Sequence, residues 1–545
     1  MRCFFTSVLL YCCTIAFAQD VALRAGSIYP KTIKGVEGDL QLVTNGTTDA
    51  SGKAVLIVME GSAYKAIRLG ADQKPAEELK LGSVIINGGT WNAVTSVLSD
   101  EGLQVLFVSN GKRTADYAVA TVKTDGPLAI GELHKLTSFP EANVFDPQTT
   151  TCKKTLPDLI LFDNGAAYDQ SDRLARSPDG QHYLLNHYTH QQKGPKKFWF
   201  ACFDKSFALE WSGEVDLPFA DLQSDVHQVL LDNAGRIILL TYVLPCAPER
   251  ASDKLCHETH ISVLRNKGTS LKNLLLEKDF VSSARILPKE NGQLLIALRY
   301  GALTGIPGQL ITVDTAITKL KAAPLADQRV PQVRRTKLSP FGMPAVEQGK
   351  KPTNSRSLKV PDEVIELLPA WNGGTLLLEG FRDAAMEIPV GGAVALRTLH
   401  GAIRATYLDA QDSIRWQQTV DRAFMTTAGE AYGSVAYRVM DDGLFLVYNH
   451  TPGGIPAINA TYGEDDVKPK KGKAPTVEAS ALHSAWIPAN GTAPVEHTLG
   501  KPEKGFTLCP MTMVVGRAGA NAWIKGYDRG TQHQFVEFDP RGAMK

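Results

Sequence analysis

Residues 177–211 read SPDGQHYLLNHYTHQQKGPKKFWFACFDKSFALEW, and they show most clearly the pattern from which the fold can be predicted. A tight-turn signal, Ser177-Pro178-Asp179-Gly180, comes directly before a short apolar run. A polar segment then leads to a second apolar run at residues 198–203, and Asp204 begins another turn before a third run. Short apolar runs separated by glycine, proline and aspartate turns indicate antiparallel β-strands.

The same combination of a turn and an apolar run occurs eight times along the chain. Its turns are marked by Gly52, Gly102, Gly180, Gly235, Gly292, Gly374, Gly443 and Gly519. Successive glycines lie 50 to 82 residues apart, and the longest intervals contain insertions. A repeat of this length, built from short strands and without a helical period, predicts small sheets arranged around an axis.

A second unit recurs inside the repeats. Trp211 follows Asp204 by seven residues, and Trp416 follows Asp409 by the same interval. An aspartate at this place can accept hydrogen bonds from turn amides, and an aromatic ring can cover the junction between two sheets. We therefore place both tryptophans at equivalent buried positions between neighbouring sheets.

These observations predict an all-β fold, a β-propeller of four-stranded antiparallel blades. Eight repeats favour eight blades, and seven blades with an irregular terminal sheet would give nearly the same pattern. The last repeat ends near Pro540 and leaves too little chain for an outer strand. We expect a strand near residues 40–43 to complete this blade and close the ring.

Residues 1–18 have the pattern of a signal peptide, because Arg2 precedes an apolar run that ends in Ala16-Phe17-Ala18. We therefore expect an exported protein in which residues 19–545 form one propeller domain. Two segments interrupt the repeat: residues 322–361 and residues 463–478. The first is rich in proline and in basic residues, the second is rich in lysine, and both are predicted to be surface insertions.

The composition narrows the class of partner. The chain has 58 basic and 57 acidic residues, and Arg2 is removed with the predicted signal peptide. The remaining chain therefore has equal numbers of basic and acidic residues. This neutrality argues against nucleic acid or an anionic membrane as the main partner. No later stretch approaches the roughly 18 apolar residues of a spanning helix. We predict an exported protein without a transmembrane span, in the periplasm, at the outer-membrane periphery or at the cell surface.

Five cysteines follow the predicted signal peptide: Cys152, Cys202, Cys246, Cys256 and Cys509. Residues 239–243 and 260–264 read as paired strands, and Cys246 and Cys256 flank the loop between them. Because an exported chain meets oxidising conditions, we predict a disulfide between these two cysteines. The pairing of the other three is left open.

Histidine clusters do not predict a metal site. His187 and His190, close to His182, project to opposite faces of an extended strand. The same alternation separates His257 from His260, which lie beside Cys256. Zinc needs several ligands on one side, so ordinary structural histidines are the better interpretation.

The chain also lacks the common catalytic motifs. There is no Gly-x-Ser-x-Gly, no phosphate-binding Gly-x-x-x-x-Gly-Lys-Ser/Thr and no His-Glu-x-x-His. The acidic pair Asp441-Asp442 precedes a glycine and reads as a turn, and the acidic run at residues 464–466 lies among lysines without the alternation of an EF-hand.

The signal peptide, the turn at residues 177–180, the unit from Phe203 to Trp211 and the turn at residues 232–235 together resemble uncharacterised exported propeller-like proteins of Gram-negative bacteria, chiefly Bacteroidota. The resemblance spans most of residues 40–540. It implies the fold and does not specify an activity.

A further resemblance is to eight-bladed propellers of the quinoprotein type, whose blades have the same spacing between aspartate and tryptophan. That group includes quinone-dependent dehydrogenases and a non-enzymatic outer-membrane assembly scaffold. The dehydrogenases carry an adjacent cysteine pair at their cofactor, and residues 19–545 contain no such pair. We therefore expect no cofactor.

The sequence favours a non-catalytic binding or scaffold propeller of the cell envelope, with a protein or a glycan as partner. The alternatives are a carbohydrate-active enzyme or glycan-binding lectin, and then a quinoprotein-like oxidoreductase. Residues 322–361 contain eight basic residues against two acidic ones, and a local positive field can attract an acidic partner. The candidate partner-binding residues are Arg334, Arg335, Lys337, Lys350 and Lys351.

Overall fold

The structure is a computed structural model of the chain. It describes residues 24–25, 29–30, 42–60, 63–86, 88–99, 101–110, 114–140, 174–189, 194–220, 223–245, 257–265, 267–279, 281–300, 307–325, 363–390, 393–422, 424–426, 433–450, 481–500, 507–515, 522–528 and 532–540.

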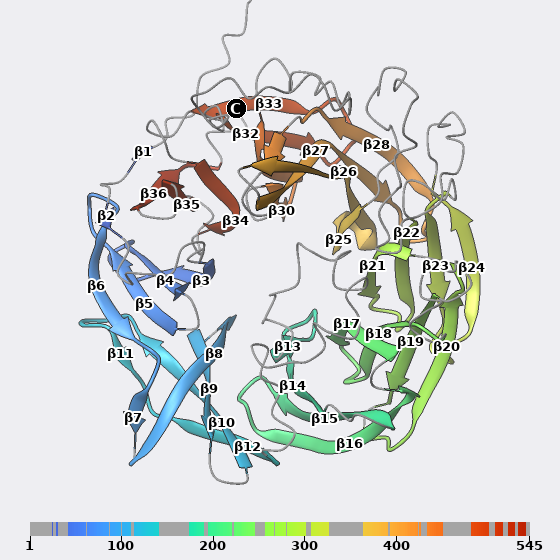
Figure 1. The fold of residues 1–545 in the computed structure, drawn as a ribbon, viewed down its shortest axis with the longest axis horizontal. Helices are drawn as coiled ribbons and strands as arrows, with labels where there is room; N and C mark the ends of the chain where they lie inside the picture. The colour runs from blue at the N-terminus through green and yellow to red at the C-terminus, as the bar shows by residue number, and fades with distance from the viewer. Residues whose placement is uncertain are drawn as a thin grey trace, which may run out of the picture.

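Eight antiparallel sheets stand side by side around a central axis, as Figure 1 shows. The predicted eight-bladed β-propeller is therefore confirmed, and the alternative with seven blades is wrong. In most blades the first strand lies nearest the axis and the fourth lies at the periphery. Among the described residues the one helical element is the single turn η6, Trp371–Gly373.

The first four blades occupy residues 42–277. Blade one contains β3 (Leu42–Thr48), β4 (Ala54–Glu60), β5 (Ala63–Leu69) and β6 (Pro75–Lys80). Blade two contains β7 (Val84–Ile86), β8 (Gly89–Ser99), β9 (Gly102–Asn110), β10 (Thr114–Lys123), β11 (Ala129–Ile130) and β12 (His134–Pro140). Blade three contains β13 (Leu174–Arg176), β14 (His182–Thr189), β15 (Pro195–Asp204) and β16 (Leu209–Ala220). Blade four contains β17 (Ser224–Leu231), β18 (Ile237–Val243), β19 (Glu258–Leu264) and β20 (Leu271–Glu277).

The other four blades complete the ring. Blade five contains β21 (Val281–Pro288), β22 (Leu294–Tyr300), β23 (Gln309–Val313) and β24 (Lys319–Pro324). Blade six contains β25 (Glu363–Pro369), β26 (Thr375–Val390), β27 (Ala393–Leu408), β28 (Ile414–Val420) and β29 (Phe424–Thr426). Blade seven contains β30 (Val435–Met440), β31 (Gly443–His450), β32 (Ala481–Pro488) and β33 (Val495–Gly500). Blade eight contains β34 (Thr507–Val515), β35 (Ala522–Asp528) and β36 (Gln532–Phe538), with β1 (Arg24–Ala25) and β2 (Tyr29–Pro30).

The hydrophobic cores lie between blades. Every residue of β22 is buried, so this strand is covered on both of its faces. Its even-numbered residues, from Leu294 to Tyr300, pack with β18 and β19 of blade four. Leu295 and Ala297 pack on the other face with Leu377 of blade six. This double burial explains why the second strands read as continuous apolar runs rather than as alternating ones.

Seven of the eight repeated turns connect the first strand of a blade to the second, and the Gly102 turn of blade two connects β8 to β9. Aspartates shape many of the turns at this end of the blades. In the unit from the decisive stretch, Asp204 accepts hydrogen bonds from the backbone N–H groups of Ser206 and Ala208 at 2.8 and 3.0 Å. The Ser206 hydroxyl, followed by these amides, lowers the pKa of Asp204, against the opposing effect of its partial burial. Charge on this carboxylate therefore stabilises the turn.

Trp211 and Trp416 occupy equivalent places near the start of the outer strand, as predicted. Trp211 pairs with Cys202 and Trp416 pairs with Tyr407, one residue before the same bulge in each blade. Trp416 reaches blade seven, where its Nε1 donates to the Ala489 carbonyl at 3.0 Å. Both rings are half-buried, so the expectation of full burial is wrong. The outermost strand has no fifth strand beyond it, and solvent reaches the ring from that side.

The ring closes through a different segment from the one predicted. Leu42–Thr48 is β3, the first strand of blade one, and pairs with β4. The shorter strands β1 and β2 pair with β36 instead and complete blade eight. Residues 42–48 lead directly into the Asp49 turn, so they pair with the strand that follows, because a hairpin is the nearest pairing that the chain offers.

A glutamine joins the two ends of the ring. Gln73 lies in the turn before β6 of blade one, and its side chain is directed to blade eight. Its Nε2 donates to Glu537 at 2.8 Å, and its Oε1 accepts from Trp523 Nε1 at 2.9 Å. Gln73 is 7% exposed, and Trp523 is 2% exposed. The amide therefore pairs with the buried Trp523 N–H at one end and with the half-buried Glu537 carboxylate at the other.

We predict that Gln73→Ala destabilises the protein by about 1–3 kcal/mol, because it leaves the buried Trp523 N–H without its acceptor. The free energy of unfolding, from urea titration followed by tryptophan fluorescence, measures this loss. Gln411→Ala is the control, since Gln411 lies in an exposed turn and uses its backbone N–H there. Equal stability of the two variants would contradict the proposed role of Gln73.

Candidate functional site: the loop face

The antiparallel blades give the ring two unlike faces. Connections between first and second strands, and between third and fourth, lie on one face, which we call the turn face. The other connections lie on the opposite face, the loop face. The four longest connections, residues 141–173, 244–257, 325–362 and 451–480, all belong to the loop face. Loops that a rigid scaffold supports are the usual place for binding residues.

The predicted insertions belong to this face. Strand β24 ends at Pro324, so the connection after it begins at residue 325, not at Ala322 as expected. It joins blade five to blade six. The segment at residues 463–478 falls within the connection between β31 and β32 of blade seven. The five candidate partner-binding residues, from Arg334 to Lys351, lie outside the described residues, as do residues 463–478.

Polar side chains fix the innermost strands beneath the loop face. Five of these strands contain a β-bulge, at residues 43–45, 93–95, 226–228, 281–283 and 364–366. In four of the blades the polar residue after the bulge bonds to the innermost strand of the next blade. The pairs are Asn45 with Ser96 O (2.8 Å), Gln228 with Ile286 N (3.2 Å), Ser283 with Val364 N (3.0 Å) and Glu366 with the Tyr437 hydroxyl (3.3 Å). A bulge redirects its side chains, which allows these links.

Blade six extends furthest on the loop face. Strands β26 and β27 have 16 residues each and stay paired from Thr375 and Leu408 to Val390 and Ala393. The neighbouring strands β25 and β28 pair only with the lower part of this hairpin, up to Gly380 and Ile403. The short strand β29 pairs with residues 398–400 above them. The hairpin therefore projects beyond the body of its blade.

A buried ion cluster supports the base of this hairpin. Glu379 on β26 is completely buried, and its carboxylate accepts from Arg299 Nε of blade five at 2.5 Å. Its second oxygen accepts from Arg404 Nε on β27 at 2.8 Å. Removal of one partner from a buried ion pair costs about 3–5 kcal/mol, because the other charge is left without compensation. The cluster thus fixes blade six against blade five, close to the start of β25, where Glu379 is paired with Val364.

Arg422 fixes the connection from blade six to blade seven. Its Nε donates to the Gly401 carbonyl and its Nη1 to the Gly433 carbonyl, both at 2.9 Å. Burial lowers the pKa of Arg422 to about 10, and the Glu363 carboxylate opposes this shift. The side chain therefore stays charged at neutral pH. These contacts hold residues that follow β28 against the projecting hairpin.

A third polar cluster lies at the loop end of blade seven. The Tyr448 hydroxyl donates to Glu496 at 3.0 Å, and burial together with this carboxylate raises the pKa of Tyr448. The His483 ring lies 4.8 Å from the His450 ring and 6.0 Å from the Tyr448 ring, between centroids. His450 and Ala481 are paired and flank the connection of residues 451–480. Three polar clusters thus support the loop face on blades five to seven.

The sequence did not single out these residues. The three residues of the ion cluster are spread over more than 100 residues of sequence, from Arg299 through Glu379 to Arg404, and no local motif joins them. The sequence feature that could have indicated the cluster is a charged residue at the end of an apolar run, as in Leu376-Leu377-Leu378-Glu379 and Leu298-Arg299. A charged residue in a strand that is covered on both faces needs a buried partner.

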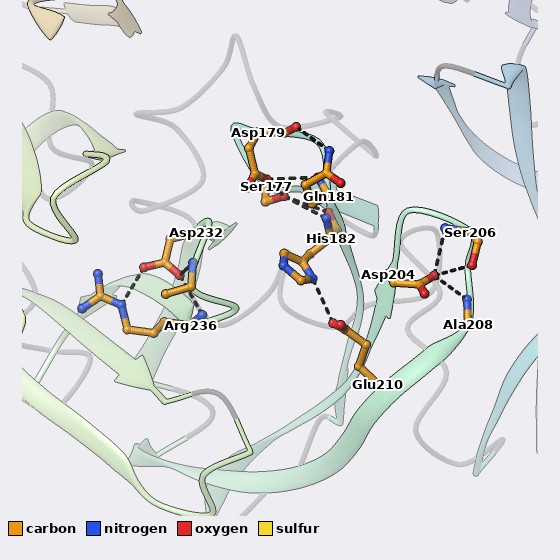
Figure 2. A network of polar contacts seen from close by, with 11 residues as sticks. Ser177, Asp179, Gln181, His182, Asp204, Ser206, Ala208, Glu210, Asp232 and Arg236 are labelled. Carbon is orange, nitrogen blue, oxygen red and sulfur yellow. Dashed lines mark hydrogen bonds and ion pairs between the residues drawn. The ribbon is translucent and has the colours of Figure 1, made fainter.

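Of the histidines that the sequence singled out near the first turn, His182 belongs to the turn face. Figure 2 shows His182 directed to Glu210, with Nδ1 2.9 Å from Oε2. Asp179 accepts from the Ser177 hydroxyl at 2.6 Å, and its backbone N–H donates to Asn233 of blade four at 3.0 Å. The network stabilises the turns and joins two blades. The side chains of His187 and His190 lie outside the described residues.

The other residues considered as metal ligands also have structural roles. His260 contacts Glu258 at 2.8 Å and Asn273 at 3.1 Å. Asp441 and Asp442 form the two-residue turn between β30 and β31, as predicted. Within the described ranges no group of three or more histidine, cysteine or acidic residues has the arrangement of a metal site. Within the same ranges no helix is long and apolar enough to span a membrane.

The described inner strands offer few carboxylates for a glycosidase. They carry Asp225 on β17 and Glu363 and Glu366 on β25. Glu366 is occupied by the Tyr437 hydroxyl and by its neighbour's backbone N–H. A glycosidase needs two carboxyl groups about 5–10 Å apart across a sugar site. Glu363 and Glu366 lie on one strand of blade six, and Asp225 lies on the innermost strand of blade four.

The fold defines the chain as an eight-bladed β-propeller. No family model and no curated protein matches the sequence. The chain is similar to a solved protein of unknown function from Dyadobacter fermentans, with 13% identity over 80% of this chain and 96% of that one and a TM-score of 0.31.

Two similar solved structures are peptidases. Dipeptidyl peptidase 4 of Porphyromonas gingivalis shares 9% identity over 94% of this chain and 65% of its own, with a TM-score of 0.40. Prolyl oligopeptidase B of Galerina marginata shares 10% identity over 90% of this chain and 56% of its own, with a TM-score of 0.38. The chain therefore spans less than two thirds of either peptidase.

The structure describes the strands that flank the predicted disulfide but not its two cysteines. Strands β18 and β19 pair over residues 237–243 and 258–264, as expected. Cys246 and Cys256 lie outside the described residues. The disulfide stays a prediction. Peptide mapping without reduction should recover the linked pair, and recovery of both thiols free from freshly exported protein would reject it.

We predict that His483 makes the protein less stable in mild acid. Burial and the neighbouring His450 lower the pKa of His483 to about 4, below its ordinary value of 6.5. Between these values the unfolded chain binds a proton that the folded side chain does not, so the free energy of unfolding falls as pH falls from 6.5 to about 4.

Urea titrations over this pH range test the prediction. His483→Phe should show a smaller decrease, because phenylalanine keeps the ring packing and cannot take up a proton. His134→Phe, at an exposed position, is the control and should keep the decrease of the original protein. A decrease that is as large in His483→Phe as in the original protein would assign the effect to other groups.

Proposed function

We propose that the protein is an exported, non-catalytic binding propeller of the cell envelope, and that it holds an acidic protein partner on its loop face. The observation that carries this proposal is the gathering of the long connections on one face, three of them on blades four to seven. Polar clusters and a projecting hairpin support this side of the ring, whereas the turn face is formed by short, internally bonded turns.

The basic connection between blades five and six supplies the chemistry. It contains eight basic residues from Arg329 to Lys359 in a chain whose charges otherwise nearly balance. Such a segment attracts an acidic surface within a screening distance of about 8–10 Å. Its repeated prolines reduce the conformational entropy that binding would remove. A protein surface with clustered carboxylates fits these properties.

We predict that replacing Arg334, Arg335, Lys337, Lys350 and Lys351 with glutamine removes a salt-sensitive partner. The tagged protein is exported in its native host, captured from the envelope at low and at high salt, and its partners are identified by mass spectrometry. Far-ultraviolet circular dichroism and the melting midpoint should not change, because these residues lie in a connection between blades.

A matched variant replaces five exposed lysines elsewhere: Lys53, Lys74, Lys205, Lys319 and Lys321. It removes the same charge and should keep the partner. Equal loss in both variants would mean that only net charge matters, and an undiminished partner set in the first variant would reject the assignment. Recovery of a glycan instead of a protein would favour the lectin or the carbohydrate-active enzyme.

A further inference from the structure

A hollow of about 380 Å³ lies at the outer edge of blade four, on the turn face and away from the proposed partner site. It is formed by the end of β19, the start of β20 and the turn between them. Its lining residues are Val263, Arg265, Ser270, Leu271 and Lys272. Two of the five are cationic and none is acidic.

The strand register places Lys272 on one face of the sheet with Val263, because the two residues are paired across the strands. Arg265 directly follows β19 and Ser270 directly precedes β20, and both also line the hollow. Val263 belongs to the core between blades four and five, which identifies this as the side that faces blade five.

The hollow contains hydrogen-bond donors that have no acceptor in the described part of the chain. The Arg265 guanidinium and the Ser270 hydroxyl make no hydrogen bond to another described residue. Lys272 Nζ donates to the Ala316 carbonyl of blade five, which fixes its position and leaves two N–H groups. A side chain in place of Gly268 would crowd the turn, because its Cβ would lie 2.8 Å from the Arg265 carbonyl oxygen.

A second hollow, of about 330 Å³ between blades one and two, provides a comparison within the molecule. It also contains an arginine, Arg68, but that side chain has its partners inside the protein. Asp49 lies 3.1 Å away and Glu77 2.5 Å away, and the Thr124 carbonyl accepts at 2.6 Å. Its cation therefore serves to join blades, whereas Arg265 has no carboxylate partner among the described residues.

We infer that the hollow of blade four binds an oxyanion, a phosphate or sulfate group. The guanidinium can bind two of its oxygens, while the ammonium and the hydroxyl bind others. Arg265, Ser270 and Lys272 are exposed, so the hollow can accept an oxyanion that is carried on a sugar ring. The group can come from free phosphate or from a sulfate ester on a saccharide.

Isothermal titration of the full chain tests this site with inorganic phosphate, glucose 6-sulfate and glucose. We expect phosphate and glucose 6-sulfate to bind and glucose to give no signal. Arg265→Gln should weaken binding by about tenfold, the effect of one lost charge-assisted hydrogen bond. Tighter binding of the sulfate ester than of phosphate identifies the ester as the ligand, and the reverse order identifies the free anion.

Two further variants keep the test decisive. Ser270→Ala removes only an exposed hydroxyl and should weaken binding with an unchanged melting midpoint, even where Arg265→Gln fails to fold. Lys53→Gln, in the hollow between blades one and two, should bind as the original protein does. Absence of binding by both anions, or equal binding by Arg265→Gln and the original protein, would overturn the inference.

Discussion

Burial of each blade on both faces is the constraint on which the rest of this structure depends. A sheet whose second strand is apolar on either side, as β22 is, cannot be stable alone in water. It needs a neighbour on each side, and each neighbour has the same need, so only a closed ring satisfies all eight blades. The polar links at the bulges and at the turns are secondary to this requirement, and they set the angle and register of blades that apolar packing brings together.

The same constraint places the short turns and the long connections on opposite faces. Short turns recur at one end of the blades because the first and second strands, and the third and fourth, stay paired up to their ends. The other end must accommodate the steps from one strand pair to the next, and there the chain tolerates long connections. The ion cluster at Glu379 and the carbonyl contacts of Arg422 belong to blade six, which carries the longest hairpin. Buried charged side chains thus stabilise blade six, the blade whose hairpin extends beyond its neighbours.

The sequence predicted what depends on local turns. Glycine and aspartate turns located the start of the second strand in seven blades and the start of β9 in blade two. The spacing from Asp204 to Trp211 located the outer strand in two blades. The sequence failed where the outcome depends on distant pairing. Leu42 and Val43 resemble a closing strand, but their hairpin with β4 is closer along the chain, and β1 and β2 are too short to be recognised as strands. The cluster of Arg299, Glu379 and Arg404 depends on the contact between two blades, which no local pattern contains.

The closure of blade eight also orders the events of folding. Arg24 pairs with Glu537 and Ala25 with Val536, residues that are almost the whole chain apart. Contacts of such long separation form slowly, because the intervening chain must first be brought together. During synthesis, seven blades can therefore assemble one after another before the amino-terminal strands pair with β36. Until then the inner surfaces of blades one and eight remain accessible, and an incomplete ring of one molecule presents a surface that matches the missing blade of another.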